Sequence, residues 1–164
     1  MAVSPVPEGY HTVTAYLVVD DAAKALAFYA EAFGAEELFR LPMTRDGRER
    51  IGHAETRIGD TILMLSDEWP EMDYLGPNKR GGYSTGFVIY GPDVDARFER
   101  AINAGATVIQ PVADQFWGDR MGTLKDPFGH SWTLGTHIED VPPEELESRM
   151  RAYHKAQDAQ ADVP

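Results

Sequence analysis

Two segments of the chain, 71 residues apart, share one pattern of apolar, acidic and glycine residues. YLVVDDAAKALAFYAEAFGAEE, from Tyr16 to Glu37, matches FVIYGPDVDARFERAINAGATV, from Phe87 to Val108. Each segment predicts a buried strand, an acidic turn, an amphipathic helix and a Gly-Ala pair that opens another strand. A second match pairs RIGDTILML (57–65) with PFGHSWTLG (127–135), at an offset of 70. Such a duplication predicts two copies of one folding unit.

Within each copy the expected order is strand, helix and then three strands. Asp20 or Asp21 predicts the N-cap of the first helix, and Gly34 a left-handed C-cap. The dipeptide Asp46-Gly47 predicts a hairpin turn between the next two strands. The fold class expected is therefore α+β, with two βαβββ modules and a C-terminal helix. The expected boundaries are 12–65 for the first module, 66–83 for an intermodule loop, 84–138 for the second module, 139–157 for the C-terminal helix and 158–164 for a frayed tail.

Composition excludes several classes of function. The chain has 164 residues and a net charge of −12, which argues against binding to a phosphate backbone. It has no cysteine, which excludes disulfides, thiolate catalysis and Cys-ligated metals. The first residues, MAVSPVPEGYH, lack the pattern of a signal peptide, and no apolar run reaches membrane-spanning length. We therefore expect a cytoplasmic protein with neither nucleic acid nor membrane as a partner.

The segment VVDDAAKALAFYAEAFGAEE, the segment KDPFGHSWTLGT from Lys125 to Thr136, and the repeat together resemble the vicinal oxygen chelate superfamily. That group includes glyoxalase I, bleomycin-resistance proteins, extradiol dioxygenases and fosfomycin-resistance enzymes. The chain looks most similar to its demethylubiquinone-methyltransferase-like branch, over about Thr12 to Ile138. The resemblance implies a U-shaped trough that holds a small molecule, and a homodimer. It does not name a function, because this fold hosts lyases, isomerases, oxygenases, transferases and binding proteins.

Metal enzymes of the superfamily place ligands on the first and last strand of each module. Projected onto this chain, these positions are Thr14 and Leu63 in the first module and Thr85 and Thr133 in the second. A divalent transition metal prefers imidazole or carboxylate ligands. The resemblance therefore implies a trough without the usual metal site and without a cofactor.

His53 and Glu55 form a suggestive polar pair in the segment GHAETRIG. Residues two apart on a strand project from the same face of the sheet. Beside a trough, His53 would serve as a general base and Glu55 as the group that orients it. An exposed polar face with Arg40 as cross-strand partner explains the pair equally well, and an off-pattern metal clip is a third interpretation.

Trp117, Asp119 and Met121 alternate in the segment FWGDRMGTLKD, which predicts that they share one face of a strand. If this face lines the trough, Trp117 and Met121 form an apolar wall and Asp119 a polar anchor, as in many small-molecule sites. The alternative is that Trp117 packs in the core or at a subunit interface.

Tyr16 and Phe87 correspond to each other in the repeat and share parity with Thr14 and Thr85. This parity predicts that both aromatic rings face the trough, where they would stack on a planar ligand. Ordinary packing explains the two rings as well.

Three hypotheses about function follow from these residues. The first is a metal-free protein that binds a small organic molecule in its trough and sequesters a toxic or antibiotic compound. The second is a lyase or isomerase that uses His53 and Glu55 for proton transfer on a small carbonyl or cyclic substrate. The third is a metal-dependent glyoxalase-type or dioxygenase-type enzyme with displaced ligands.

Overall fold

The computed structural model describes residues 3–45 and 47–161, with side chains described as far as residue 156. Position 46 of the expected hairpin turn and positions 162–164 of the expected tail lie outside the described residues. The first module consists of β1 (Tyr16–Val19), α1 (Ala22–Phe33), β2 (Glu36–Arg45), β3 (Arg48–Ile58) and β4 (Thr61–Asp67). The second consists of β5 (Gly86–Tyr90), α3 (Val94–Asn103), β6 (Thr107–Asp114), β7 (Asp119–Lys125) and β8 (Ser131–His137).

Each module builds one four-stranded mixed sheet. The strand orders are β1-β4-β3-β2 and β5-β8-β7-β6, and in each sheet the first pair is parallel while the others are antiparallel. The predicted pair of βαβββ modules is therefore confirmed. The connection between them carries a 3-10 turn, η1 (Pro70–Met72), and a short helix, α2 (Pro77–Arg80), and the chain continues into α4 (Pro143–Ala161).

Local sequence signals set ends of α1 and α3, the helices of the two modules. The Asp21 side chain caps α1 by accepting a hydrogen bond from the backbone N–H of Lys24 at 3.0 Å. Gly34 closes α1 with a φ of 69°, a left-handed conformation that glycine adopts without steric cost. In the second module, the Asp93 side chain caps α3 through the N–H of Ala96.

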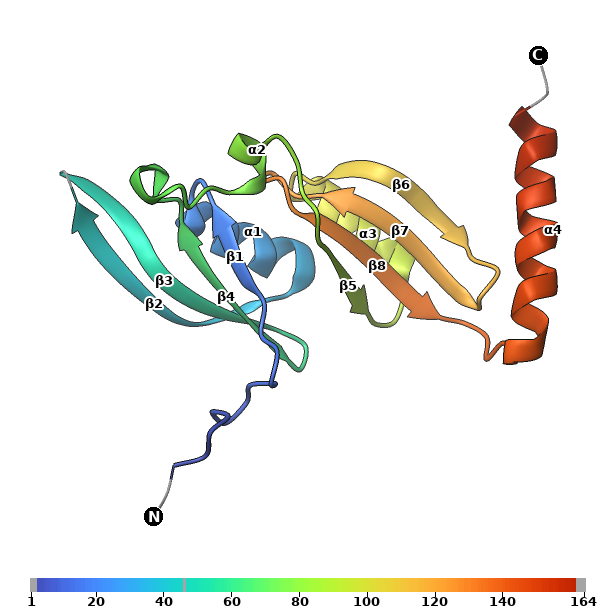
Figure 1. Ribbon diagram of the computed structural model, residues 1–164, viewed down its shortest axis with the longest axis horizontal. Coiled ribbons are helices and arrows are strands. Elements are labelled where there is room, and N and C mark those ends of the chain that lie inside the picture. The colour runs from blue at the N-terminus through green and yellow to red at the C-terminus, as the bar shows by residue number, and fades with distance from the viewer. Residues whose placement is uncertain (1–2, 46, 162–164) are drawn as a thin grey trace.

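The two helices pack against each other at the centre of the molecule, each on one face of its own sheet (Figure 1). The other face of each sheet carries no helix of its own module, and we call it the open face. Because the helix-covered faces are turned toward the centre, the two open faces point away from each other. Helix α4 stands apart at the end of the second module (Figure 1). Among the residues that the model describes, no helix is long and apolar enough to span a membrane.

A single buried carboxylate joins the two modules. Asp126, in the turn before β8, is 2% exposed. Its Oδ2 accepts hydrogen bonds from the Tyr29 hydroxyl of α1 at 2.9 Å and from the Trp132 indole Nε1 at 2.8 Å. Its Oδ1 accepts from the backbone N–H groups of Phe128 and His130, both at 2.9 Å. The turn of the second module is thereby fixed to the helix of the first.

Aromatic packing surrounds this carboxylate. The Trp132 ring centroid lies 5.4 Å from that of Tyr29 and 4.9 Å from that of Phe33, so Trp132 packs against helix α1 of the other module. Burial and the neighbouring Asp126 carboxylate raise the pKa of Tyr29 well above its usual value, which keeps the phenol protonated as a donor. The interface between the modules is thus an aromatic core around one satisfied anion.

Replacing Asp126 by Asn tests the role of this anion. The Asn oxygen could still accept from the two backbone N–H groups of the turn. The Asn NH₂ group would then face the Tyr29 and Trp132 donors and could not accept from them. We expect Asp126→Asn to lower the free energy of unfolding by about 3 kcal/mol, and Tyr29→Phe, which removes one donor, by about 1 kcal/mol. Urea unfolding of the three proteins measures both losses. Equal losses for the two variants would contradict this assignment.

Candidate functional site

The open face of the first sheet combines polar and apolar side chains from all four of its strands. Strand register places Tyr16 and Glu55 on either side of Met64, Phe39 beside Glu55, and Leu41 beside His53. His53 and Glu55 therefore lie on the open face, together with the aromatic ring of Tyr16. Phe39 and Leu41 add exposed apolar surface around them, at 48% and 49% exposure.

A chain of hydrogen bonds runs across this face. The Tyr16 hydroxyl lies 3.1 Å from His53 Nδ1, and His53 Nε2 lies 3.3 Å from Glu55 Oε1. A hydrogen bond from the Tyr10 hydroxyl lowers the pKa of Glu55, and the bond with His53 lowers it further, against the opposing effect of burial. Burial and Glu55 in turn raise the pKa of Tyr10 to about 12.

For a neutral imidazole, the ionised Glu55 carboxylate assigns the direction of these hydrogen bonds. An ionised Glu55 accepts, so His53 Nε2 carries the proton and Nδ1 accepts from the Tyr16 hydroxyl. Both His53 nitrogens are then engaged in hydrogen bonds, and the Tyr16 phenol is the outer end of the hydrogen-bonded chain. Arg40 is not the cross-strand partner expected for His53 and Glu55, because its guanidinium is bound to Glu37. We call this hydrogen-bonded chain the relay, because its geometry would let a proton pass along it to the phenol at its end.

The open face of the second sheet is built around Asp119. Its carboxylate is 5% exposed and accepts hydrogen bonds from Trp117 Nε1 at 3.0 Å and the Tyr90 hydroxyl at 2.8 Å, with His137 Nδ1 at 2.8 Å. Burial favours a higher pKa for Asp119, but the hydrogen bonds from His137, Tyr90 and Trp117 overcome this effect and lower it. The hydrogen-bonding capacity of the Asp119 carboxylate is thus met by its neighbours. Its bond with Trp117 Nε1 orients that indole on this face.

A cavity of about 690 Å³ lies over the same face. Trp117, Met121 and Thr133 contribute to its lining, and the Thr133 hydroxyl is 3.0 Å from that of Thr123. Tyr153 of α4 also lines it, with its ring centroid 5.7 Å from that of Phe116. The terminal helix therefore reaches the rim of this cavity through Tyr153.

Two residues that we expected on the trough face the helices instead. Leu63 is 5% exposed within the core, and Phe87 packs its ring 4.8 Å from Trp132. The strand register shows why, because Met64 and Val88, their neighbours, pair with the open-face residues Tyr16 and Thr133. A shift of one residue on a strand reverses its face. The prediction of Leu63 and Phe87 in the trough was wrong by that one residue.

Thr14 and Thr85 lie outside the strands, near the junction of the modules. The Thr14 hydroxyl donates to the His11 carbonyl at 3.2 Å. Thr85 lines, with Tyr16 and Phe87, a surface hollow of about 540 Å³ beneath the intermodule loop. Neither residue lies on a strand beside Thr133.

The corrected register still supplies no metal ligands at the superfamily positions. Met64 takes the place that we assigned to Leu63, and Thr14 and Thr133 offer only neutral hydroxyls, which suit a divalent transition metal poorly. In residues 3–45 and 47–161, no group of three His, Cys, Asp or Glu side chains is placed to hold a metal ion. The residues present therefore do not fit the usual metal centre of the superfamily.

Fold, repeat and open faces define a protein of the vicinal oxygen chelate type, and sequence comparison agrees. The model of the Glyoxalase/Bleomycin resistance protein/Dioxygenase superfamily matches residues 10–134, and the chain belongs to that family. Protein Rv0887c of Mycobacterium tuberculosis strain H37Rv is 45% identical over 138 residues, which cover 82% of this chain and 79% of that protein.

Two solved structures, from Micromonospora and Pseudomonas, share the fold. TioX from Micromonospora sp. ML1 is 26% identical with a TM-score of 0.58, and the match covers 80% of this chain and all of TioX. Protein PA1353 from Pseudomonas aeruginosa is 25% identical with a TM-score of 0.63, covering 79% of this chain and 99% of that one. These likenesses establish the fold and leave the chemistry to the residues of this chain.

His137 provides a test of the second open face. Hydrogen bonds to Asp119 and then Asp140 raise the pKa of His137 in the folded protein. A group whose pKa is raised by folding stabilises the folded protein at pH values below its pKa in the unfolded chain, which is about 6.5 for histidine. That contribution is lost as the pH rises through the pKa of the folded protein. We expect His137→Gln to lower the melting temperature more at about pH 5.5 than at about pH 8.5. A difference from wild type that is the same at both pH values would contradict the ion pair.

Proposed function

We propose that the open faces bind a small organic molecule that is largely apolar. The observation that carries this proposal is the collection of exposed apolar side chains around a few oriented polar groups, as ligand sites are usually built. On the first sheet Phe39 and Leu41 flank the His53 chain, and on the second Trp117 lies beside Asp119. Sequestration of a toxic or antibiotic compound in such a site needs no reaction and no metal.

We further propose that the binding unit is a homodimer. Each open face leaves large apolar side chains exposed, including Val88 at 55% and Tyr90 at 58% on the second sheet. In one chain the two open faces point in opposite directions. Each face can therefore form only one wall of a trough, and the opposing wall must come from another molecule. A second copy would cover these faces and remove their apolar surface from water.

A second candidate, a lyase or isomerase, is favoured by the relay on the first sheet. A general base needs a hydrogen-bonded partner that holds its tautomer, and Glu55 stands in that position for His53. The Tyr16 hydroxyl would then give its own proton to His53 Nδ1. Its oxygen would take a proton from a bound carbonyl or cyclic substrate. The reaction would be an enolisation or a related proton shift that needs neither redox partner nor metal.

Binding to the open face is tested with the neutral dye Nile red. We expect its fluorescence to rise on binding, and Leu41→Glu to weaken the affinity about tenfold, since burying one leucine side chain supplies roughly 1.5–3 kcal/mol. The matched control is Ile102→Glu, which places the same charge at a similarly exposed site on α3. Sedimentation of each sample shows whether a lost affinity follows from a lost dimer of the 18.2 kDa chain. Equal affinities for wild type and Leu41→Glu would contradict the proposed site.

The relay is tested by proton exchange in D₂O. Small hydroxy ketones and cyclic ketones are incubated with the protein, and proton NMR follows the loss of the α-proton signal. If the chain is an enzyme, we expect His53→Ala and Tyr16→Phe to slow exchange by a factor of roughly 10²–10⁴ while Nile red binding is retained. If wild type and His53→Ala exchange equally, the relay is structural. Ligand binding without any exchange would leave sequestration as the function.

A further inference from the structure

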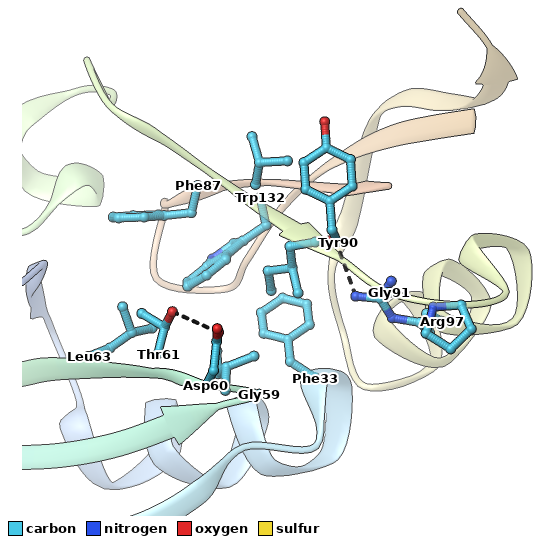
Figure 2. A pocket seen from close by; sticks show the side chains of 14 residues that line it. Phe33, Gly59, Asp60, Thr61, Leu63, Phe87, Tyr90, Gly91, Arg97 and Trp132 are labelled. Atoms are coloured by element: carbon cyan, nitrogen blue, oxygen red, sulfur yellow. Dashed lines mark hydrogen bonds between the residues drawn. The ribbon is translucent and has the colours of Figure 1, made fainter. Parts of the chain in front are cut away.

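A separate cavity of about 490 Å³ lies at the junction of the modules, on the helix side of the sheets. Figure 2 shows its apolar wall, which is formed by side chains such as Phe33 of α1, Leu63 of β4 and Trp132 of β8. Arg97 of α3 lies at one end, beside Gly91 (Figure 2). His53, Glu55 and Asp119 do not line this cavity, whereas Val88 and Tyr90 of β5, which are exposed on the second open face, do.

The Arg97 guanidinium is partly buried and holds only weak hydrogen bonds. Nη1 donates to the Gly135 carbonyl at 3.4 Å and Nη2 to the Ile89 carbonyl at 3.3 Å. A guanidinium has five N–H donors, so three are left for a further partner. Burial and then the nearby charge of Arg100 lower the pKa of Arg97, and within the described part of the chain no carboxylate offsets them. The group remains a cation, because an arginine side chain is not deprotonated in proteins.

Gly91 gives this guanidinium its place. A Cβ at position 91 would lie 2.8 Å from Nη1 and 3.0 Å from Cζ of Arg97, so the guanidinium would have to move from its present position. Gly91 does not have a positive φ, so its backbone does not require glycine. The absent side chain therefore opens space for the cation against the backbone of β5 and the following turn.

We propose that this junction cavity binds a small amphipathic monocarboxylate. The carboxylate would pair with Arg97 through the charge-assisted, two-pronged geometry that guanidinium groups form with carboxylates. The apolar part would lie against Phe33, Leu63 and Trp132, and the volume suits a molecule with one or two rings. Asp60 lines the cavity on the other side of Phe33 in Figure 2 and would repel a second negative charge. This site does not depend on the function proposed for the open faces.

The probe is 2-naphthoate, with the neutral 2-naphthalenemethanol as its uncharged counterpart. We expect calorimetry to show one naphthoate per chain and Arg97→Gln to weaken its binding at least tenfold, with the affinity for the alcohol unchanged. Arg100→Gln is the matched control, because its guanidinium donates to the Ala32 carbonyl and does not line the cavity. That control keeps the Arg97 guanidinium and should weaken naphthoate binding far less than Arg97→Gln does, and circular dichroism verifies that each variant is folded.

Amide NMR shifts locate the probe even if Arg97→Gln fails to fold. In the wild-type protein we expect naphthoate to shift the amides of Thr61, Leu63 and Gly91 and to leave those of His53 and Glu55 in place. Shifts centred on His53, an Arg97→Gln affinity within twofold of wild type, or no binding at millimolar naphthoate would each overturn the proposal. The Leu41→Glu variant should keep its naphthoate affinity, which separates this site from the open face.

Discussion

The buried carboxylate of Asp126 determines how the two halves of this protein face each other. Four donors converge on it, from the α1 phenol, from the β8 indole and from two backbone groups of its own turn. An isolated buried anion would cost several kcal/mol, so the position is tolerable only with this full set of partners. Since one donor comes from the other module, the helices are held at the centre and the open faces are directed outward. Both proposed sites are consequences of that arrangement.

The sequence predicts the modules well because the repeat carries capping and turn residues at matching places. It assigns the side chains of β4 and β5 to the wrong face of each sheet. For β4 the reason is the length of the connection that precedes the strand. β3 and β4 are joined by two residues, Gly59 and Asp60, whereas five residues join β7 to β8. Alignment of Gly59 with Gly129 therefore puts Leu63 opposite Thr133, although one faces a helix and the other does not.

The structurally equivalent positions are revealed by the helix starts. Asp67 accepts a hydrogen bond from the first N–H of α1, and Thr136 accepts one from the first N–H of α3. These residues are 69 apart, not 70, and the single-residue difference reverses the face. Parity within one strand is immune to such errors, which is why His53 with Glu55, and Asp119 with Met121, were placed together correctly on their faces.

Other parts of the candidate sites have no local signal. Tyr10 reaches Glu55 from the N-terminal segment, and the role of Tyr16 as the outer end of the relay depends on a contact across 37 residues. Arg97 stands in the segment VDARFERAIN, where alternating charges are typical of a solvated helix face. Arg97 lies at the end of a cavity because α1 and α3 pack against each other and against the sheets. Such tertiary contacts leave no signal in a short stretch of sequence.

The two proposed sites differ in charge in a way that separates their ligands. The hydrogen-bonded chain on the first open face ends in a phenol backed by the Glu55 carboxylate, and the protein as a whole carries a charge of −12. An anionic molecule therefore gains nothing from the field near the first open face. At the module junction the apolar wall lowers the local dielectric response, which strengthens the attraction of Arg97 for an anion over the short distance of a direct contact. A neutral apolar compound lacks that attraction and has no reason to prefer the junction. Under both proposals, one chain would hold a neutral ligand on its open face and an anionic one at the module junction.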